Sequence, residues 1–307
     1  MKASPAGVSR ASDRDLRRYC VDNQAFDAPR LPPGLHIVAT PIGNLGDITL
    51  RALAALAGAD LIACEDTRVT RKLLDRYGIA TPLAPYHDHN AAKARPMLLR
   101  RLAEGAAIAL VSDAGTPLIS DPGFKLVREA REAGHAVTAL PGASAVLAAL
   151  TVAGLPTDAF FFAGFLPPKQ GARRSRIAEL VRVPATIVLY ETGPRVAETL
   201  ADLAAGFGPR EAALCRELTK LHEEVRRGDL ATLAEGCASG EVRGEMVLVI
   251  APPQAAGQPS PEAAERLLRE ALSRASLKDA VAEVALATGL PRREIYQRAL
   301  ALAKEPT

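Results

Sequence analysis

Residues 35–49 read LHIVATPIGNLGDIT, a short apolar run followed directly by a turn that contains Gly43 and Gly46. A short apolar run bounded by turn residues is typical of a buried strand. The two glycines let the backbone approach a ligand closely, and Asp47 or Thr49 can cap a following helix. The turn lacks the three-glycine spacing of a dinucleotide fingerprint. On its own it therefore fits either a ligand loop or a plain capped turn.

The same pattern of strand, turn and helix recurs downstream of this segment. Further apolar runs occur at Leu61–Cys64, Ala107–Val111 and Val137–Leu140, and helical stretches such as Thr49–Leu56 and Arg68–Tyr77 separate them. Strands that alternate with helices indicate a parallel-rich sheet covered on both faces. The first part of the chain therefore predicts one α/β domain.

A second set of runs follows Gly154-Leu155-Pro156, whose composition indicates a domain junction. Its strands are predicted at Ala159–Phe162, Thr186–Tyr190, Ala212–Cys215 and Met246–Ile250, with helices at Arg195–Ala205 and Leu230–Glu235. We therefore predict an α/β fold with two domains, residues 34–155 and residues 156–250.

The ends of the chain differ in composition from these two domains. Residues 1–33 carry Pro, Ser and mixed charge without periodicity, which predicts a flexible N-terminal tail. Residues 251–261 are rich in Pro and Ala and form a predicted linker. Residues 262–307 predict a small helical appendix with helix-turn-helix spacing, and Arg292, Arg293 and Arg298 lie on or near its second recognition-type helix.

Bulk composition excludes several classes of protein. The chain has 307 residues, 48% of them hydrophobic, and a net charge of +3, which neither requires nor excludes a nucleic-acid partner. Four scattered cysteines without metal or redox spacing fit reduced thiols in a cytosolic protein. The amino terminus does not resemble a signal peptide, and the longest apolar run, Ala143–Leu155, is too short to span a bilayer. We expect a cytoplasmic protein with no membrane association.

Three loops that follow predicted strands of the first domain carry unusual residues. Besides the turn after Ala39, the chain has Ser112-Asp113-Ala114-Gly115-Thr116-Pro117, then Ser120-Asp121-Pro122-Gly123, and later Pro141-Gly142-Ala143-Ser144-Ala145. The last of these begins a helix, whose free amides suit an anion. In α/β sheets ligands bind beyond the carboxyl ends of the strands. Three such loops in one sheet predict a ligand cleft.

These loops resemble the cofactor loops of the tetrapyrrole methylase superfamily. Within it, Cys64-Glu65-Asp66-Thr67-Arg68, Tyr86-His87-Asp88-His89-Asn90 and Tyr190-Glu191-Thr192-Gly193-Pro194-Arg195 resemble the ribosomal RNA small subunit methyltransferase I family. That resemblance implies 2′-O-methylation of a cytidine of 16S rRNA at the decoding centre. It also implies two α/β domains with S-adenosylmethionine in the cleft between them, usually in a homodimer, with the helical appendix beyond.

One departure from the superfamily bears on the substrate. The first loop of the superfamily usually reads Gly-x-Gly-Pro-Gly-Asp, whereas here Pro41 replaces the first glycine and the turn is a residue longer. This argues against a porphyrin-type substrate. A tetrapyrrole methyltransferase is the alternative that keeps the cofactor, and a non-catalytic regulator built on the helix-turn-helix is a third hypothesis that leaves the cleft loops unexplained.

The resemblance and the residue chemistry together give a set of candidate site residues. The cofactor-binding positions implied by the resemblance are Pro41, Ile42, Gly43, Asp113, Ala114, Gly115, Thr116, Ala143, Ser144 and Ala145. A ribose hydroxyl is a poor acid, so a positioned base can add about 10²–10⁴ in rate. Glu65, Asp66, Glu191 and Glu217 are the candidates by chemistry, and their spacing does not choose among them. No metal is required, because the leaving group departs as a neutral thioether.

Candidate RNA-binding residues are basic or polar groups outside the cofactor loops. They are Arg68, Lys72, His87, Asn90, Lys169, Arg173, Arg174, Arg292 and Arg293. Lys169, Arg173 and Arg174 belong to a cluster without acids until Glu179, which favours phosphate binding over a solvated helix face. The pair His87 and His89 lacks a Cys or His cluster elsewhere, so a polar substrate loop is favoured over a metal site. The expected partner is 16S rRNA within the small ribosomal subunit.

Overall fold

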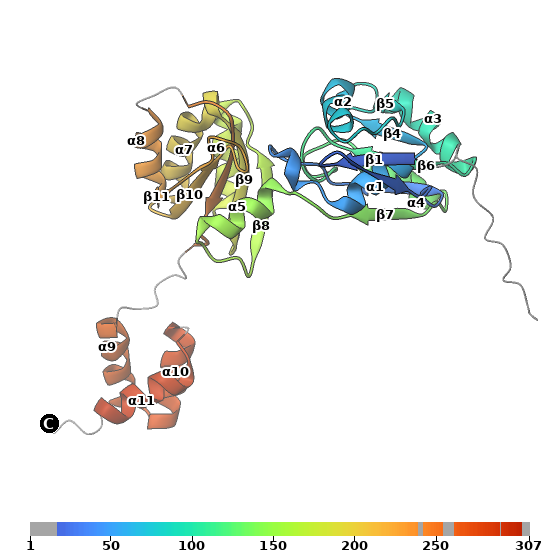
Figure 1. Cartoon of the computed structure of the whole chain (residues 1–307). Helices are drawn as coiled ribbons and strands as arrows, with labels where there is room; N and C mark the ends of the chain where they lie inside the picture. The colour runs from blue at the N-terminus through green and yellow to red at the C-terminus, as the bar shows by residue number, and fades with distance from the viewer. Residues whose placement is uncertain (1–16, 239–241, 254–260, 289, 303–307) are drawn as a thin grey trace, which may run out of the picture.

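The computed structural model describes residues 17–238, 242–253, 261–288 and 290–302. It contains two α/β domains and a group of three C-terminal helices (Figure 1). In the part of the chain that it describes, no helix is both long enough and apolar enough to cross a membrane.

The N-terminal domain is built on a five-stranded parallel sheet. Its strands are β3 (Gly34–Val38), β4 (Leu61–Cys64), β5 (Leu83–Pro85), β6 (Ala107–Val111) and β7 (Val137–Leu140), in the order β5-β4-β6-β3-β7. Every neighbouring pair is parallel, so the carboxyl ends of all five strands meet at one edge. The apolar runs of the sequence became the central strands, and every residue of β6 is buried.

Helices cover both faces of this sheet, as the alternation of strands and helices predicts. They are α1 (Leu50–Gly58), α2 (Thr67–Arg76), α3 (Ala91–Ala103) and α4 (Phe124–Glu132), and the short 3₁₀ helix η1 (Leu45–Asp47) precedes α1. Leu53 and Leu74 pack with Val38 on one face, while Leu98 and Leu126 pack with Ile108 on the other. The side chain of Thr49 accepts a hydrogen bond from the backbone of Ala52 and so caps α1, as predicted for this position.

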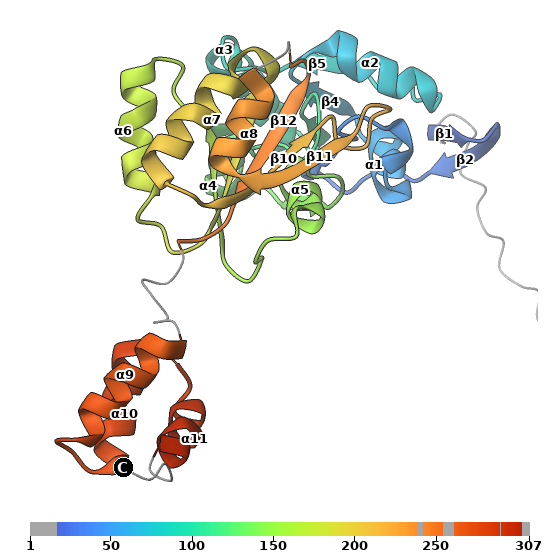
Figure 2. The ribbon, with the colours of Figure 1, turned by 90° about the vertical axis from the view of Figure 1, so that its left-hand side faces the viewer.

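The C-terminal α/β domain has a mixed sheet. Its strands are β8 (Phe160–Phe165), β9 (Thr186–Thr192), β10 (Glu211–Arg216), β11 (Glu224–Asp229) and β12 (Glu245–Ile250), in the order β11-β10-β12-β9-β8. Only β8 and β9 pair in parallel among these neighbours. The sequence did not predict β11, because its charged residues carry no apolar run and it forms an edge strand. Helices α6 (Gln170–Leu180), α7 (Gly193–Phe207) and α8 (Leu230–Ala238) cover one face (Figure 2).

The boundary between the two domains lies earlier than predicted. Helix α5 (Ala145–Ala153) was assigned to the first domain, but its residues Val146 and Leu150 pack against Val188 and Val247 of the second sheet. The helix is apolar on most sides, and this open sheet face is the surface that can bury it. The chain therefore passes between domains at the turn before α5, rather than at residues 154–156.

The predicted flexible tail is also wrong for its second half. Strands β1 (Arg17–Val21) and β2 (Gln24–Ala28) form a hairpin whose turn residues Asp22 and Asn23 have φ values of 49° and 64°. Positive φ at both central residues is the geometry that two-residue hairpins favour, and Asp and Asn tolerate it. Tyr19 stacks on Phe26 at 5.4 Å and is buried with α1, so the hairpin belongs to the first domain. Residues 1–16 lie outside the described residues.

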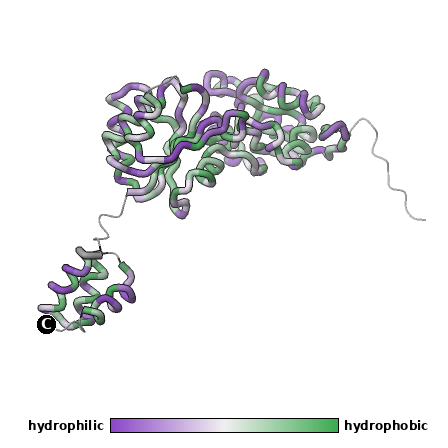
Figure 3. The backbone as a smooth tube through the Cα atoms, turned by 60° about the vertical axis from the view of Figure 1, so that its left-hand side comes forward, coloured by the Kyte–Doolittle hydropathy of each residue, from purple (hydrophilic) through white to green (hydrophobic). Residues whose placement is uncertain are grey.

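The C-terminal appendix contains α9 (Pro261–Leu272), α10 (Leu277–Thr288) and α11 (Arg292–Leu302). Hydrophobic and hydrophilic residues alternate along these helices (Figure 3). Leu268, Val284 and Ile295 are buried together, so the three helices form an apolar core of their own. Most of the predicted linker, residues 254–260, lies outside the described residues.

Candidate active site

Three loops meet at the carboxyl edge of the parallel sheet and are tied to one another. Thr40 and Gly115 exchange two backbone hydrogen bonds of 2.9 and 3.0 Å, which joins the loops after β3 and β6. The Thr116 hydroxyl donates to the carbonyl of Ala143 (3.1 Å) in the loop after β7. These bonds fix the relative positions of the three loops that the sequence selected.

The loops form one wall of a cavity of about 260 Å³ whose other wall belongs to the second domain. Most predicted cofactor positions line it, namely Ile42, Asp113, Ala114, Gly115, Thr116, Ser144 and Ala145. Pro41, Gly43 and Ala143 are chain neighbours of these lining residues. The opposite wall includes Tyr190, from a motif that the sequence already singled out, and Leu218, which follows β10. It also includes Met246 and Val247, which the sequence did not single out because they look like ordinary strand residues.

Gly43 lies against the second domain. A Cβ atom built on Gly43 would lie 2.4 Å from Cγ of Lys220, so a side chain there requires Lys220 to move. The Lys220 ammonium group is held by Glu217 at 3.0 Å and by Glu245 at 2.9 Å. The first glycine of the loop therefore permits a close approach between the domains at the cavity.

The loop after β6 has an unusual backbone. Leu118 and Ser120 have φ values of 74° and 62°, a left-handed conformation that costs energy in residues other than glycine. The loop presents Ile119, Ser120 and Asp121 to the cavity. The second domain also packs closely here, because a Cβ on Gly164 would lie 3.2 Å from the Ser120 hydroxyl oxygen.

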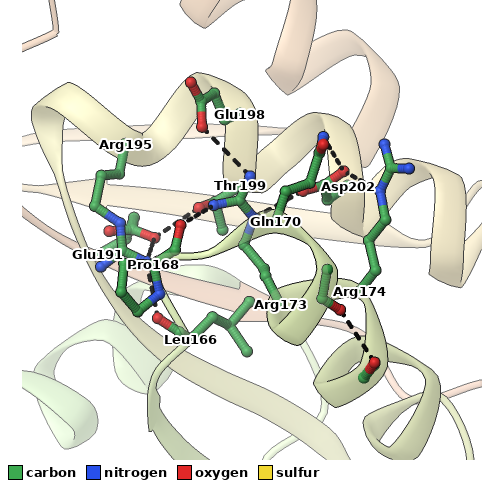
Figure 4. A network of polar contacts seen from close by, with 12 residues as sticks. Leu166, Pro168, Gln170, Arg173, Arg174, Glu191, Arg195, Glu198, Thr199 and Asp202 are labelled. Carbon is green, nitrogen blue, oxygen red and sulfur yellow. Dashed lines mark hydrogen bonds and ion pairs between the residues drawn. The ribbon is translucent and has the colours of Figure 1, made fainter.

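Two of the predicted catalytic carboxylates are already bound by protein groups. Glu191 is 1% exposed, accepts hydrogen bonds from the Thr199 hydroxyl (2.7 Å) and the Thr192 amide (2.8 Å), and pairs with Arg195 at 3.5 Å (Figure 4). Its oxygens hold the turn that begins α7, and these contacts favour a structural role for Glu191 over that of the predicted general base.

Glu217 is also engaged by its neighbours. A backbone hydrogen bond from Glu245 and a side-chain bond from Lys220 hold the pKa of Glu217 below its usual value. A carboxylate stabilised in this way is a weak base. We therefore correct the prediction for Glu217 and assign it to positioning Lys220.

Glu65 and Asp66 line a second recess beside the cavity. The recess is lined by Glu65, Asp66, Thr67, Arg68, Pro85, His87, Asp88, His89 and Asp113, and Asp113 also lines the main cavity. The backbone N–H of Asp66 donates to Oδ1 of Asp113 (2.9 Å), which joins the loops after β4 and β6. Burial, followed by the charges of Asp113 and Asp88, raises the pKa of Glu65.

Asp66 is a poor candidate for a base. Its carboxylate accepts hydrogen bonds from the side chain and backbone of Arg68, and these lower the pKa of Asp66 to about 2. It also caps the first turn of α2. These contacts explain the acid at this position structurally, whereas the pKa of Glu65 is raised by its burial.

Asp121 was noted in the sequence only as a turn residue. It is half-buried and lines the main cavity. Burial, then the charge of Glu65, raises the pKa of Asp121 to about 6, with smaller contributions from Asp113 and Asp88. The sequence contained no signal for this, because the groups responsible lie on separate loops. In the part of the chain that is described, no cluster of three or more His, Cys, Asp or Glu side chains has the arrangement of a metal site.

Comparison with known proteins identifies the family. The family model for tetrapyrrole (corrin/porphyrin) methylases matches residues 34–234, and the RsmI C-terminal HTH domain matches residues 258–303. A ribosomal RNA small subunit methyltransferase I from Mesorhizobium japonicum is 50% identical over 284 residues, 92% of this chain and 96% of that protein. One from Erythrobacter litoralis is 53% identical over 275 residues, 90% of this chain and 97% of that protein. This chain belongs to the ribosomal RNA small subunit methyltransferase I family.

Solved structures share the fold of this methyltransferase I family member. Uroporphyrin-III C-methyltransferase from Thermus thermophilus, in complex with S-adenosylhomocysteine, has a TM-score of 0.51 and 20% identity, covering 71% of this chain and 97% of that one. Cobalt precorrin-4 methyltransferase has a TM-score of 0.53 and 16% identity, covering 71% and 94%. At these identities the likeness concerns the fold alone, and it confirms the predicted tetrapyrrole methylase architecture.

The predicted RNA-binding residues differ in where they lie and in whether their side chains are exposed. Arg68 and His87 line the second recess, and Lys72 is exposed on α2 next to it. The Asn90 side chain accepts from the His87 amide (2.9 Å) and donates to the Pro85 carbonyl (3.0 Å), so it stabilises its own turn. Lys169, Arg174, Arg292 and Arg293 are exposed on α6 and α11 or at their starts.

Arg173 is not available to RNA, which corrects its prediction. Its side chain is 2% exposed, and its Nε donates to Asp202 at 2.7 Å inside the second domain (Figure 4). Arg174 and Gln170 reach the same carboxylate from α6. The spacing along the chain shows a run of basic residues here. It does not show that Asp202, on α7, faces them. The physical role of Arg173 is to pair with a buried acid.

Proposed function

We propose that this chain transfers the methyl group of S-adenosylmethionine to the 2′-oxygen of a cytidine ribose in 16S rRNA at the decoding centre. The observation that carries the proposal is the convergence of the predicted cofactor loops on one cavity between the domains, at the carboxyl edge of the parallel sheet. The RNA substrate is supported by relatives that match nearly the whole chain and are ribosomal RNA small subunit methyltransferases.

The cofactor fits the main cavity by chemistry. Its volume of about 260 Å³ is close to the lower end of the range for ligand pockets, about 300–1,000 Å³. Backbone groups of Gly115 and the first turn of α5 at Ala145 offer polar contacts, while Met246 and Val247 offer an apolar surface. An acceptor oxygen held in line with the methyl carbon gains roughly 7–11 kcal/mol from orientation alone.

The RNA is proposed to approach from the second recess. Asp113 lines both hollows, so a nucleotide in the recess is adjacent to the cofactor cavity. Arg68 and Lys72 are exposed on α2 beside it and are available for phosphate contacts. Exposed Arg292 and Arg293 on α11 provide a second, separate set of contacts. The partner is 16S rRNA within the small subunit, and we propose that the reaction occurs in the cytoplasm in a homodimer.

Transfer of radiolabelled methyl groups tests the proposal. The purified chain is incubated with labelled S-adenosylmethionine and either unmethylated 30S subunits, naked 16S rRNA or uroporphyrinogen. We expect label in the 30S subunits above all, because the surrounding RNA must be folded to give the target its shape. Label in uroporphyrinogen alone would favour the tetrapyrrole alternative, and no transfer to any of them would refute the proposed activity.

Calorimetry separates cofactor binding from catalysis. S-adenosylmethionine is expected to bind the chelator-treated protein, and Asp113→Ala is expected to weaken binding more than Asp121→Ala. Asp113 holds the loop after β4 through the Asp66 amide, whereas the hydrogen bond between Asp121 and Ser112 stays within the loop after β6. Undetectable binding, or binding only with added metal, would contradict the site assignment. Light scattering at several protein concentrations tests the homodimer. A molar mass equal to that of one chain at every concentration would exclude it.

A further inference from the structure

Two acids of the main cavity, Asp113 and Asp121, form no ion pair among the described residues, and Asp113 already accepts a hydrogen bond from the Asp66 amide. Glu191 pairs with Arg195, and Glu217 and Glu245 share Lys220. Asp121 lines the same cavity, and none of the ion pairs among the described residues involves it. Its carboxylate therefore retains acceptor capacity toward a ligand in the cavity.

The backbone around Asp121 is held in place from two sides. The left-handed residues Leu118 and Ser120 turn the loop into the cavity, and Gly164 of β8 approaches Ser120 closely from the second domain. Persistent strain of this kind is concentrated at functional sites, because the surrounding structure must enforce it. The loop thus fixes the position of Asp121 between the two domains.

The surroundings of Asp121 suit a nucleoside. Tyr190 and Phe165 line the same cavity, and their rings contact each other edge-on with centroids 5.5 Å apart. Phe165 is 51% exposed, so its ring is available to a base. Unstacked RNA bases are recognised by stacking on aromatic side chains. Because Asp113 lines both hollows, a nucleotide whose backbone lies in the second recess can extend toward these rings, in the cavity that Asp121 also lines.

Charged groups from every surrounding loop act on this carboxyl. Glu65 follows β4, Asp88 follows β5, and Asp113 lies on the same loop as Asp121, while the hydroxyl of Tyr190 approaches from β9. Burial, followed by these like charges, makes the carboxylate more basic and raises the pKa of Asp121 to about 6, against the effect of a hydrogen bond with Ser112. A base is most useful when its pKa lies near the working pH.

We propose that Asp121 is the general base of the methyl transfer, a role that rests on the proposed function. As the ribose oxygen bonds to the methyl carbon, the carbon–sulfur bond breaks and its electron pair passes to sulfur, which leaves as a neutral thioether. The hydroxyl proton passes to the Asp121 carboxylate and then to water. Glu65 lines the neighbouring recess and acts on Asp121 through its charge, as a positioning residue.

The decisive variant is Asp121→Asn, compared with Glu65→Gln in parallel. Single-turnover methyl transfer is measured on 30S subunits at saturating S-adenosylmethionine from pH 5 to 9. For the wild type, we expect the rate to rise with pH through about 6 and then level off, because the base must lose its proton first. Asp121→Asn should lower the plateau by about 10²–10⁴-fold and abolish the rising limb, while affinity for S-adenosylmethionine changes little.

Other outcomes lead to different conclusions. An Asp121→Asn rate within threefold of wild type, or an unchanged rising limb, would overturn the proposal. So would a limb lost in Glu65→Gln but kept in Asp121→Asn. If Asp121→Asn fails to fold by circular dichroism, Asp121→Ala with added formate replaces it: a rate restored by formate is expected, and none at any concentration would refute the role. Absence of transfer by the wild type would instead refute the proposed function.

Discussion

Replacing Arg173 by Met tests whether this residue belongs to the fold or to the RNA surface. Its guanidinium donates to Asp202 at 2.7 Å and to the Pro168 carbonyl at 3.3 Å, and it contacts Glu198 at 3.3 Å. The side chain of Asp202 is 4% exposed. Burial alone would raise the pKa of Asp202, but hydrogen bonds from Arg174 and Arg173 hold it below its usual value. The carboxylate therefore stays charged and requires its partner.

The expected loss of stability follows from this burial. Removing one member of a buried ion pair costs about 3–5 kcal/mol, because the remaining charge stays desolvated. Arg174 contacts the same carboxylate but is 62% exposed, so Arg174→Met should cost less than about 1 kcal/mol. The combination of Arg173→Met with Asp202→Leu should recover much of the loss, since an apolar pair can replace a buried ion pair.

The loss of stability within the second domain is measured by urea unfolding, with the hydrogen exchange of amides in β9 and β12 as the signal. Binding of 16S rRNA at several salt concentrations is measured on the same variants. We expect Arg173→Met to lower the unfolding free energy and to leave the salt dependence unchanged. An unaltered stability together with a log–log slope reduced by about one would mean that Arg173 contacts phosphate, and the assignment to the core would be refuted.

Three further predictions follow from the site and the domain organisation. Gly43→Ala should weaken S-adenosylmethionine binding by about 1 kcal/mol, roughly fivefold by calorimetry, because the new methyl group displaces Lys220; unchanged affinity would contradict the close approach. Asp121→Asn should melt at a higher temperature than wild type at pH 8 but not at pH 4. The folded protein binds the Asp121 proton more tightly than the unfolded chain does, so wild type loses stability as pH rises from about 3.8 to about 6. Equal differences at both pH values would contradict this. Truncation before Ala251 should leave cofactor affinity unchanged but weaken rRNA binding and flatten its salt dependence; an unaltered slope would exclude a role for the appendix in RNA recognition.

The sequence predicted those parts of the fold that depend on local pattern. The central strands, the cap at Thr49 and the loop at Gly115 are specified by neighbouring residues, so their positions could be read directly. The hairpin Arg17–Ala28 was missed because its two strands are short and only Tyr19 and Ala28 are buried, together with residues of α1. Helix α5 was assigned to the wrong domain, since an apolar helix does not specify which sheet will cover it.

The site residues divide along the same line. The predicted cofactor positions lie in contiguous motifs, and most of them line the main cavity. The roles of Arg173 and Glu191 depend on partners from α7, which spacing along the chain does not reveal. The raised pKa of Asp121 comes from its burial between the two domains and then from the charge of Glu65 on another loop. The sequence alone could therefore not predict residue properties that depend on packing between distant segments.

The most direct test of the central claim is the chemical position of the transferred methyl group. Unmethylated 30S subunits are treated with the wild-type chain and S-adenosylmethionine, the 16S rRNA is digested to nucleosides and fragments, and the added methyl group is located by mass spectrometry. The account predicts one new methyl group, on the ribose 2′-oxygen of a single cytidine at the decoding centre. A methyl group found on a base, or no methyl group in the 16S rRNA, would contradict it.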